Sequence, residues 1–225
     1  MFRLLARSAL LLAVVTAGGL ALIRLRGYDD SAVSQFFDSC TPMPCWQGIR
    51  PGETTTDAAI AILQVHPWVD TVRRAFGEPY PGAPTTTLVY WTWSSRYPFA
   101  EAYPFTRQGM LVTDQGVVQR ISLTTGIPLG DIWLALGSPD GGAVDYASYT
   151  SHSVLIENTA LFSHAGVAAT ANLSTDCAFR YPNLWDTAVH LWLQDGSTLG
   201  VEHVAYPMYL KVMRTGYHRI RASFC

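Results

Sequence analysis

The chain is poor in charge and lacks the local motifs that would name a reaction. Charged residues make up only 14% of its 225 residues, and Lys211 is the only lysine. The Gly-x-Ser-x-Gly, His-Glu-x-x-His, phosphate-loop and Gly-x-Gly-x-x-Gly patterns are missing, so serine hydrolase, zinc peptidase and nucleotide-binding functions have no support. The six histidines are scattered along the sequence. No catalytic residue, metal ligand or cofactor is therefore predicted.

The charge that is present is unevenly distributed. Four of the 15 basic residues and none of the 17 acidic ones lie in residues 1–27, so the remainder carries 11 basic and 17 acidic residues. The net negative charge of residues 28–225 repels the phosphate backbone of nucleic acids, which argues against nucleic acid as a partner.

One long apolar run, Ser8 to Ile23, lies near the N-terminus, with Arg3 and Arg7 before it and Arg24 and Arg26 after it. This pattern is typical of exported proteins. Because the run is longer than the usual core of a cleaved signal, we expect a single-pass anchor in the cell membrane, with the body extracytoplasmic. Secretion after cleavage is the alternative. The pairs of small residues that would permit cleavage are Ala17 with Gly19 and Gly19 with Ala21. No cysteine closes the run, so a lipid anchor is not expected.

All four cysteines follow the leader, and an even number in an oxidising compartment favours disulfides over metal binding. The simplest of the three pairings joins Cys40 with Cys45 and Cys177 with Cys225.

The remaining residues predict an α+β fold, with short helices packed on an antiparallel sheet. Residues 28–39 read as a polar stalk or a short helix. Thr54, with Asp57 three residues later, begins a helix that Pro67 ends, and a second helix is predicted over Trp68–Phe76. Strands are predicted at 85–94, 109–114 and 117–125.

The same order then begins again, with a helix over Leu129–Leu136 and strands at 144–150, 153–162 and 166–173. We therefore expect two tandem helix-then-strands units, 40–125 and 126–225, after a leader (1–27) and a stalk (28–39). The second unit would end in a four-stranded meander with strands at 187–194, 197–204, 208–214 and 217–224.

The register of that meander follows from its apolar residues. A three-residue loop, Gln194–Gly196, would pair Leu191 with Leu199 and Val189 with Val201, whereas a two-residue loop would split the apolar set between both faces. The buried set would be Val189, Leu191, Leu193, Leu199 and Val201. His190 and Trp192 would lie on the opposite face.

The turn and cap residues of both units also carry a resemblance. They are Gly48, Ile49, Gly52, Thr54, Thr55, Gly130, Asp131, Leu136, Gly137, Pro139 and Asp140. With these residues the chain resembles uncharacterised exported bacterial proteins with a Cys-Pro-Cys-Trp-like segment. More distantly, it is similar to small outer-membrane assembly lipoproteins and to the β-lactamase inhibitor protein fold. The resemblance implies a binding or scaffolding module without catalysis.

Residues 90–105 are rich in aromatic side chains interleaved with proline, a composition that suits binding at low entropic cost. One hypothesis is that they form a partner surface with Trp91, Trp93, Tyr97, Phe99, Tyr103 and Phe105. The alternative is that these rings cap the edge of the core.

The function predicted overall is a non-catalytic envelope module that binds the membrane through its N-terminal segment and an envelope protein or glycan through its body. An exported hydrolase-like enzyme and a sensory or structural ectodomain remain the alternatives.

Overall fold

The structure is a computed structural model of the chain. It describes residues 16, 18, 31–37, 42–76, 86–99, 108–148, 153–176, 182–195 and 204–212. The chain divides into two compact units, Met1–Ala32 and Val33–Cys225. Among the described residues, no helix is long and apolar enough to cross a membrane. The predicted anchor lies outside those residues, apart from Thr16 and Gly18, which are helical.

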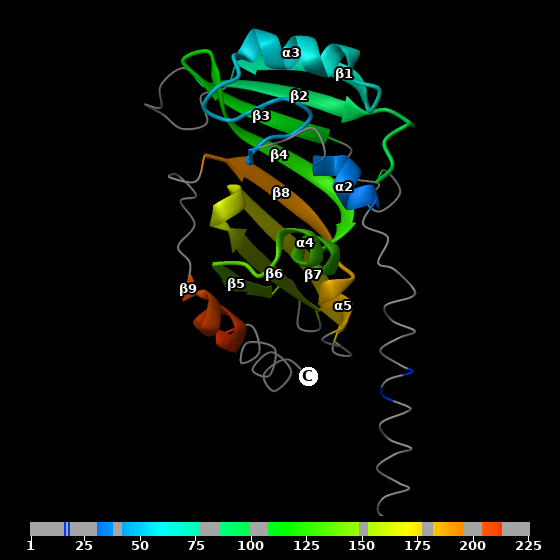
Figure 1. Cartoon of the computed structure of the whole chain (residues 1–225), viewed down its shortest axis with the longest axis vertical. Helices are drawn as coiled ribbons and strands as arrows, with labels where there is room; N and C mark the ends of the chain where they lie inside the picture. Colours follow the sequence, from blue (N-terminus) through cyan, green and yellow to red (C-terminus); the bar gives the residue numbers. More distant parts are fainter. Residues whose placement is uncertain are drawn as a thin grey trace, which may run out of the picture. The chain divides into compact units, whose positions relative to one another are not determined.

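The second unit is built on one antiparallel sheet with a few short helices (Figure 1). Its strands are β1 (Val69–Phe76), β2 (Thr87–Trp93), β3 (Gln108–Asp114), β4 (Val117–Pro128), β5 (Gly141–Ser148), β6 (Ser153–Phe162), β7 (Val167–Asp176), β8 (Ala188–Gln194) and β9 (Val204–Ala205). Its helices are α2 (Ser31–Phe37), α3 (Thr56–Val65), α4 (Leu129–Leu136), the 3₁₀ turn η2 (Ser163–Ala165) and α5 (Pro182–Trp185). Residues 206–212 are also helical. One antiparallel sheet with short helices is consistent with the predicted α+β class, and a mostly-β description fits it as well.

The strands lie in the order β1-β2-β3-β4-β8-β7-β6-β5-β9. The first four strands therefore occupy one half of the sheet in chain order, and β5 to β8 occupy the other half in reverse order. The two halves meet where β4 pairs with β8, with Leu123 opposite Leu191. We call this border the seam.

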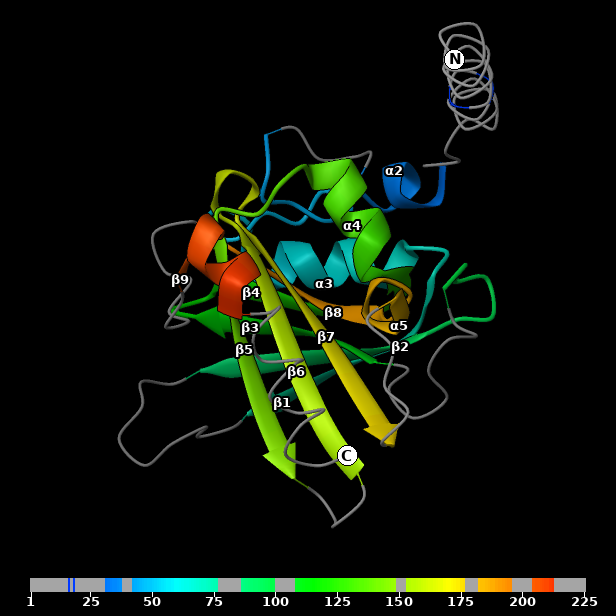
Figure 2. The same ribbon diagram turned by 90° about the horizontal axis from the view of Figure 1, so that it is seen from below.

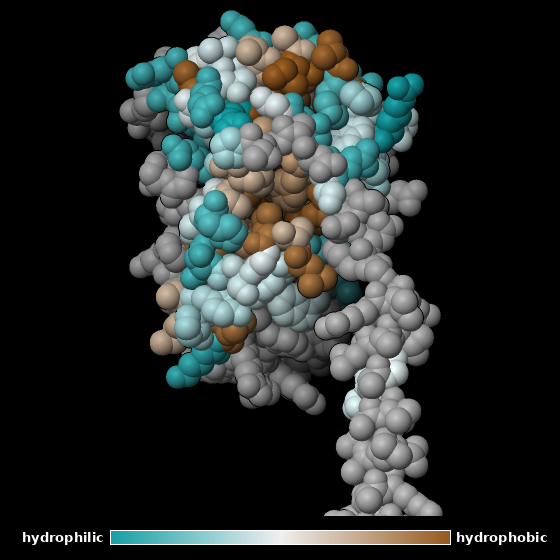
Figure 3. Space-filling model, viewed as in Figure 1, coloured by the Kyte–Doolittle hydropathy of each residue, from teal (hydrophilic) through white to brown (hydrophobic). Residues whose placement is uncertain are grey.

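The helices pack against one face of the sheet, and Figure 2 shows α2, α3 and α4 together on that side. Ala59, Leu63 and Ile132 from the helices are fully buried against strand residues that include Ile121 and Leu191. The same side carries exposed apolar residues as well. Leu134 of α4 is 66% exposed, and Figure 3 shows hydrophobic surface across the middle of this side. No helix among the described residues packs on the opposite face, which we call the helix-free face.

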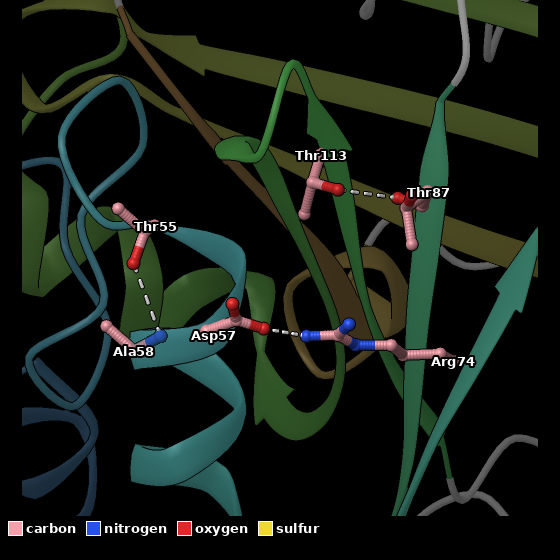
Figure 4. Close-up of polar contacts among 6 residues, drawn as sticks. All are labelled: Thr55, Asp57, Ala58, Arg74, Thr87 and Thr113. Carbon is pink, nitrogen blue, oxygen red and sulfur yellow. Dashed lines mark hydrogen bonds and ion pairs between the residues drawn. The ribbon is translucent and has the colours of Figure 1, made fainter.

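Helix α3 begins one residue later than the sequence predicted. Thr55 is the N-cap, and its hydroxyl accepts a hydrogen bond from the backbone N–H of Ala58 (Figure 4). Thr54 instead accepts a bond from the backbone N–H of Arg50, which closes the preceding turn. Asp57 is ion-paired with Arg74 of β1, so the first turn of the helix is tied to the edge of the sheet.

The prediction of a helix over Trp68–Phe76 was wrong, because this segment is the edge strand β1. It pairs with β2 from Val69 to Phe76, with one irregularity near Asp70. The apolar spacing fits a helix equally well, and pairing with the long neighbouring strand outweighs local helix propensity. The predicted strands between residues 85 and 173 correspond to β2 to β7, the strand at 187–194 corresponds to β8, and the helix Leu129–Leu136 is confirmed.

The predicted C-terminal meander was also wrong. Strand β8 lies between β4 and β7, so Leu191 faces Leu123 and Ala169 and cannot pair with Leu199. The segment predicted as a strand over 208–214 is helical as far as residue 212. Tyr209, on this helix, is fully buried, and its hydroxyl donates to Asn158 Oδ1 over 2.8 Å. Leu199, Val201 and residues 217–224 lie outside the described residues.

The segment predicted as a stalk or a short helix is helical, and it contributes to the core. Val33 and Phe36 of α2 are buried, and the Phe36 ring centroid lies 5.7 Å from that of Phe99. Residues 33–37 are therefore a packed element of the second unit.

Candidate functional site

A polar cluster on the helix-free face lies at the seam. His190 Nε2 lies 2.7 Å from Ser122 Oγ, and His190 Nδ1 lies 3.2 Å from Thr124 Oγ1. Ser122 and Thr124 lie on this face because they alternate with the buried Ile121 and Leu123 along β4. His190 alternates in the same way with Val189 and Leu191 on β8, as the sequence predicted.

The surroundings of His190 keep its ring neutral. Burial lowers the pKa of His190 to about 4. Both ring nitrogens face hydroxyl groups, and no carboxylate of the described residues is hydrogen-bonded to the ring. A hydroxyl can donate or accept, so Ser122 and Thr124 satisfy the one donor and the one acceptor of a neutral imidazole. The cluster is therefore uncharged at neutral pH.

A small pocket of about 140 Å³ opens beside this cluster. It is lined by Thr124, Thr125, Thr170, Asn172, Ala188, Val189 and His190. The pairing of β4 with β8 is irregular here, because the register passes from Thr124 opposite His190 to Pro128 opposite Ala188. Such a bulge bends a strand and re-aims its side chains. We call this hollow the seam pocket.

Hydrogen bonds hold the walls of the seam pocket. The Thr125 hydroxyl donates to the Val189 carbonyl over 2.9 Å and accepts from the backbone N–H of Ile127. Thr170 Oγ1 lies 3.0 Å from Thr159 Oγ1 on the next strand. These contacts use part of the capacity of each hydroxyl and leave lone pairs for a bound group.

A row of larger side chains crosses the same face. Arg73 lies opposite Tyr90, Tyr90 opposite Met110, Met110 opposite Ser122, and Ser122 opposite Trp192. Arg73 is exposed, while Tyr90, Met110 and Trp192 are half-buried. We call Arg73, Tyr90, Met110 and Trp192 the outer row. Arg, Tyr, Met and Trp are the residue types enriched in the centres of protein interfaces.

Trp192 joins the outer row to the polar cluster. Its ring centroid lies 4.6 Å from that of His190 and 5.4 Å from the guanidinium carbon of Arg120. Arg120 Nε in turn donates to Gln194 Oε1 over 2.7 Å. The contacts with His190 and Arg120 restrict the orientation of the Trp192 indole, so its exposed part forms a pre-organised surface.

The aromatic partner surface predicted for residues 90–105 is not on the surface where the structure describes it. Trp91 is 1% exposed, Trp93 7% and Tyr97 4%, while Phe99 is half-buried against Tyr97. Trp91 and Trp93 alternate onto the helix-covered face, where the core excludes water. Tyr103 and Phe105 lie outside the described residues. The alternative, that these rings cap the core, is therefore correct for Trp91, Trp93 and Tyr97.

Tyr97 contacts β4 at Thr124, a residue that lines the seam pocket. Its ring is stacked on Trp93 with centroids 4.0 Å apart, and its hydroxyl donates to the Thr124 carbonyl over 3.2 Å. Burial raises the pKa of Tyr97, so the phenol remains a donor at all physiological pH values. The aromatic segment thus contacts β4 at Thr124, next to the polar cluster.

The cysteines are described only in part. Cys45 is disulfide-bonded. Its partner lies outside the described residues, as do Cys40, Cys177 and Cys225. The pairing of Cys40 with Cys45 remains a prediction.

A second histidine contact lies at the turn between β6 and β7. Asp140 Oδ2 accepts a 2.6 Å bond from the backbone N–H of Ser163 and lies 3.4 Å from His164 Nδ1. Partial burial would raise the pKa of Asp140, but the hydrogen bonds from Ser163 and His164 outweigh it and lower the pKa. His164 Nε2 lies 3.1 Å from the carbonyl oxygen of Leu136, so the ring ties this turn to the end of α4.

The Ser122–His190 pair has the spacing of a nucleophile and its base, but its surroundings do not fit that chemistry. Ser122 is 4% exposed, so its hydroxyl is closed to a substrate. In a catalytic triad, a carboxylate accepts a hydrogen bond from the second ring nitrogen of the histidine and stabilises the imidazolium. Here that nitrogen, Nδ1 of His190, faces the Thr124 hydroxyl instead. No group of three or more metal-ligating side chains occurs within the described ranges.

No protein-family model matches the chain, and neither a curated protein nor a solved structure shows significant similarity to it. Any functional conclusion therefore depends on the site itself.

Sequence reasoning missed most of this site. The alternation along β8 placed His190 and Trp192 on one face, but nothing local linked them to Ser122 and Thr124, more than sixty residues earlier. The signal that was available is the alternation of Ser122 and Thr124 with apolar neighbours in the strand IleSerLeuThr.

Proposed function

We propose that this chain is an exported, membrane-anchored, non-catalytic module of the cell envelope, and that it binds a protein partner on its helix-free face. The observation that carries the proposal is the outer row, in which Arg73, Tyr90, Met110 and Trp192 lie in one line across five neighbouring strands, with Ser122 of β4 between Met110 and Trp192. Few side chains contribute most of the binding energy of an interface, and Trp, Tyr and Arg dominate that set.

The architecture supports the proposal in a second way. The strand order allows two helix-then-strands units that join at the seam. A sheet with helices on one face leaves its other face available over several strands. The leader pattern and the four cysteines after it support export and membrane attachment. An exported hydrolase is the alternative, and the burial of Ser122 argues against it.

Adjacent residues of β1 provide a matched test. Arg73 faces the helix-free side opposite Tyr90, whereas Arg74 is ion-paired with Asp57 on the helix side. We expect Arg73→Ala combined with Tyr90→Ala to abolish cross-linking of the membrane-bound protein to its partner in intact cells. Arg74→Ala and Leu134→Ser should leave the cross-link intact. Thermal unfolding of each purified variant verifies that it is folded.

The opposite pattern would contradict the proposal. If Leu134→Ser abolishes the cross-link and the Arg73/Tyr90 variant retains it, the partner binds the helix-covered side. The mass of the chain purified from the same membranes tests the anchor separately, because a retained leader gives the full-length mass.

A further inference from the structure

The seam pocket lies next to the outer row, on the same face and on the same strands. Thr124 and His190, which line the pocket, are each two residues along their strands from Ser122 and Trp192, which lie in the line of the outer row. A partner that covers the outer row would therefore lie over the mouth of the pocket. This step rests on the proposed function.

The chemistry of the pocket favours an uncharged, hydrogen-bonding group. Three threonine hydroxyls, the Asn172 amide and a neutral imidazole line it, and no lining residue is acidic or carries a permanent positive charge. A carboxylate or an ammonium group would lose its hydration here without gaining an opposite charge. A purely apolar group would leave the remaining lone pairs of the threonine hydroxyls without water.

Neighbouring charges do not change this conclusion. Glu157 lies opposite Asn172 on the adjacent strand and Asp145 opposite Glu157, but both are exposed and neither lines the pocket. Arg120 lies on the far side of Ser122 along β4, where it contacts Trp192 and Gln194.

The size of the pocket suits a single side chain. Its volume of about 140 Å³ equals roughly four or five water molecules, at about 30 Å³ each. Pockets for drug-sized ligands occupy about 300 Å³ or more. A primary carboxamide suits these walls, because it is planar, uncharged, and both donates and accepts hydrogen bonds.

We infer that the seam pocket is a specificity pocket that receives the carboxamide side chain of an asparagine or glutamine of the protein partner. The side chain would hydrogen-bond to the Thr124 and Thr170 hydroxyls, while Trp192 and Tyr90 contact the partner around it. The pocket would then reject partners that carry an acid or a base at the same position.

Three small molecules of nearly equal shape test this inference on the purified protein without any partner. Propanamide is neutral, propionate is anionic and propylammonium is cationic. The methyl signals of Thr124, Thr125 and Thr170 in carbon–proton correlation spectra report occupancy of the pocket. We expect propanamide to shift these signals saturably in the millimolar range, and the two ions to cause no saturable shift.

Thr170→Val removes one hydroxyl while keeping the shape of the side chain. We expect it to weaken propanamide binding about fivefold, the equivalent of one neutral hydrogen bond. The matched control is Thr92→Val, because Thr92 is also a strand threonine bonded to a neighbouring threonine, Thr71, outside the pocket. This control should leave propanamide binding unchanged.

Three results would overturn the inference: no saturable shift with propanamide, equal or tighter binding of either ion, or equal weakening by Thr92→Val. These failures are distinct from failure of the proposed function. If propanamide does not bind but the Arg73/Tyr90 variant still loses its cross-link, the partner surface stands and the specificity pocket does not. If propanamide binds as expected and that variant keeps its cross-link, the pocket stands and the proposed interface does not.

Discussion

His190 Nε2 lies 2.7 Å from Ser122 Oγ across the seam between β8 and β4. The pair joins two segments that are 68 residues apart in the chain. It also lies on the border at which the first four strands meet β5 to β8. The hydrogen bond therefore contributes both to the stability of the domain and to the shape of its helix-free face.

The stability of the domain should depend on pH through His190. Its pKa is about 4 in the folded protein against 6.5 ordinarily, so the unfolded chain binds the proton more tightly. The neutral ring's contribution is complete above about pH 6.5 and is lost as the pH falls toward 4. The full loss is on the order of 3 kcal/mol. Urea unfolding midpoints measured from pH 7.5 to 4 check this.

His190→Gln is the control for that measurement, because glutamine forms hydrogen bonds but does not titrate. Burial also lowers the pKa of His66, so the variant should keep a smaller dependence in the same direction. The contribution of Asp140 to stability changes only at lower pH, because the pKa of Asp140 is below its ordinary value of 3.8. A variant whose midpoints fall as steeply as those of the wild type would contradict the assignment to His190.

Ser122 should not be a nucleophile. Ser122→Ala is expected to lower the free energy of unfolding by about 1–3 kcal/mol, because it leaves a buried imidazole nitrogen without its partner. The wild-type protein should not react with a fluorophosphonate probe, since the hydroxyl is buried. Labelling that is lost in Ser122→Ala would instead support the hydrolase alternative.

Gly109 should tolerate no side chain while Trp91 keeps its position. A Cβ at residue 109 would lie 2.0 Å from Trp91 Cζ2, and the indole is packed against Trp46 with centroids 5.5 Å apart. We expect Gly109→Ala to destabilise the domain by about 1–3 kcal/mol. Trp91→Leu should reduce the effect of Gly109→Ala when the two are combined. A double-mutant cycle of denaturation free energies measures this coupling, and additive effects would show that the steric account is wrong.

Tyr209 should hold the helix at residues 206–212 on the sheet. Tyr209→Phe removes the hydroxyl that donates to Asn158, and both side chains are fully buried. We expect a loss of about 1–3 kcal/mol and faster amide hydrogen exchange in residues 206–212. Tyr206→Phe is the matched control, because Tyr206 lies on the same helix and is only half-buried. Equal effects of the two substitutions would show that the hydroxyl bond to Asn158 does not anchor the helix.

Local patterns were sufficient for most of the elements. The alternation of apolar residues predicted β6 and β8, and it placed Val189, Leu191 and Leu193 on the buried face. The apolar stretch Leu129–Leu136 predicted α4 with its observed bounds. These predictions succeeded because the alternation of buried and exposed positions in a strand or a helix depends on residues that are close in the sequence.

Strand partners and buried faces needed the tertiary structure. The sequence was equally compatible with β8 pairing to the residues after it, but β4 and β7 offer longer apolar strands on both of its sides. Residues 69–76 became a strand for the same reason, because pairing with β2 satisfies their backbone groups.

The sequence by itself determined the leader pattern, the net negative charge of the remaining residues, the presence of an antiparallel sheet with short helices, and the elements whose burial follows a local period. Only the tertiary structure decided which aromatic rings are buried, and that Ser122, Thr124 and His190 meet at the seam. The physical reason is that periodicity is a property of adjacent residues, whereas a site on a sheet depends on pairing between strands that are distant in the chain.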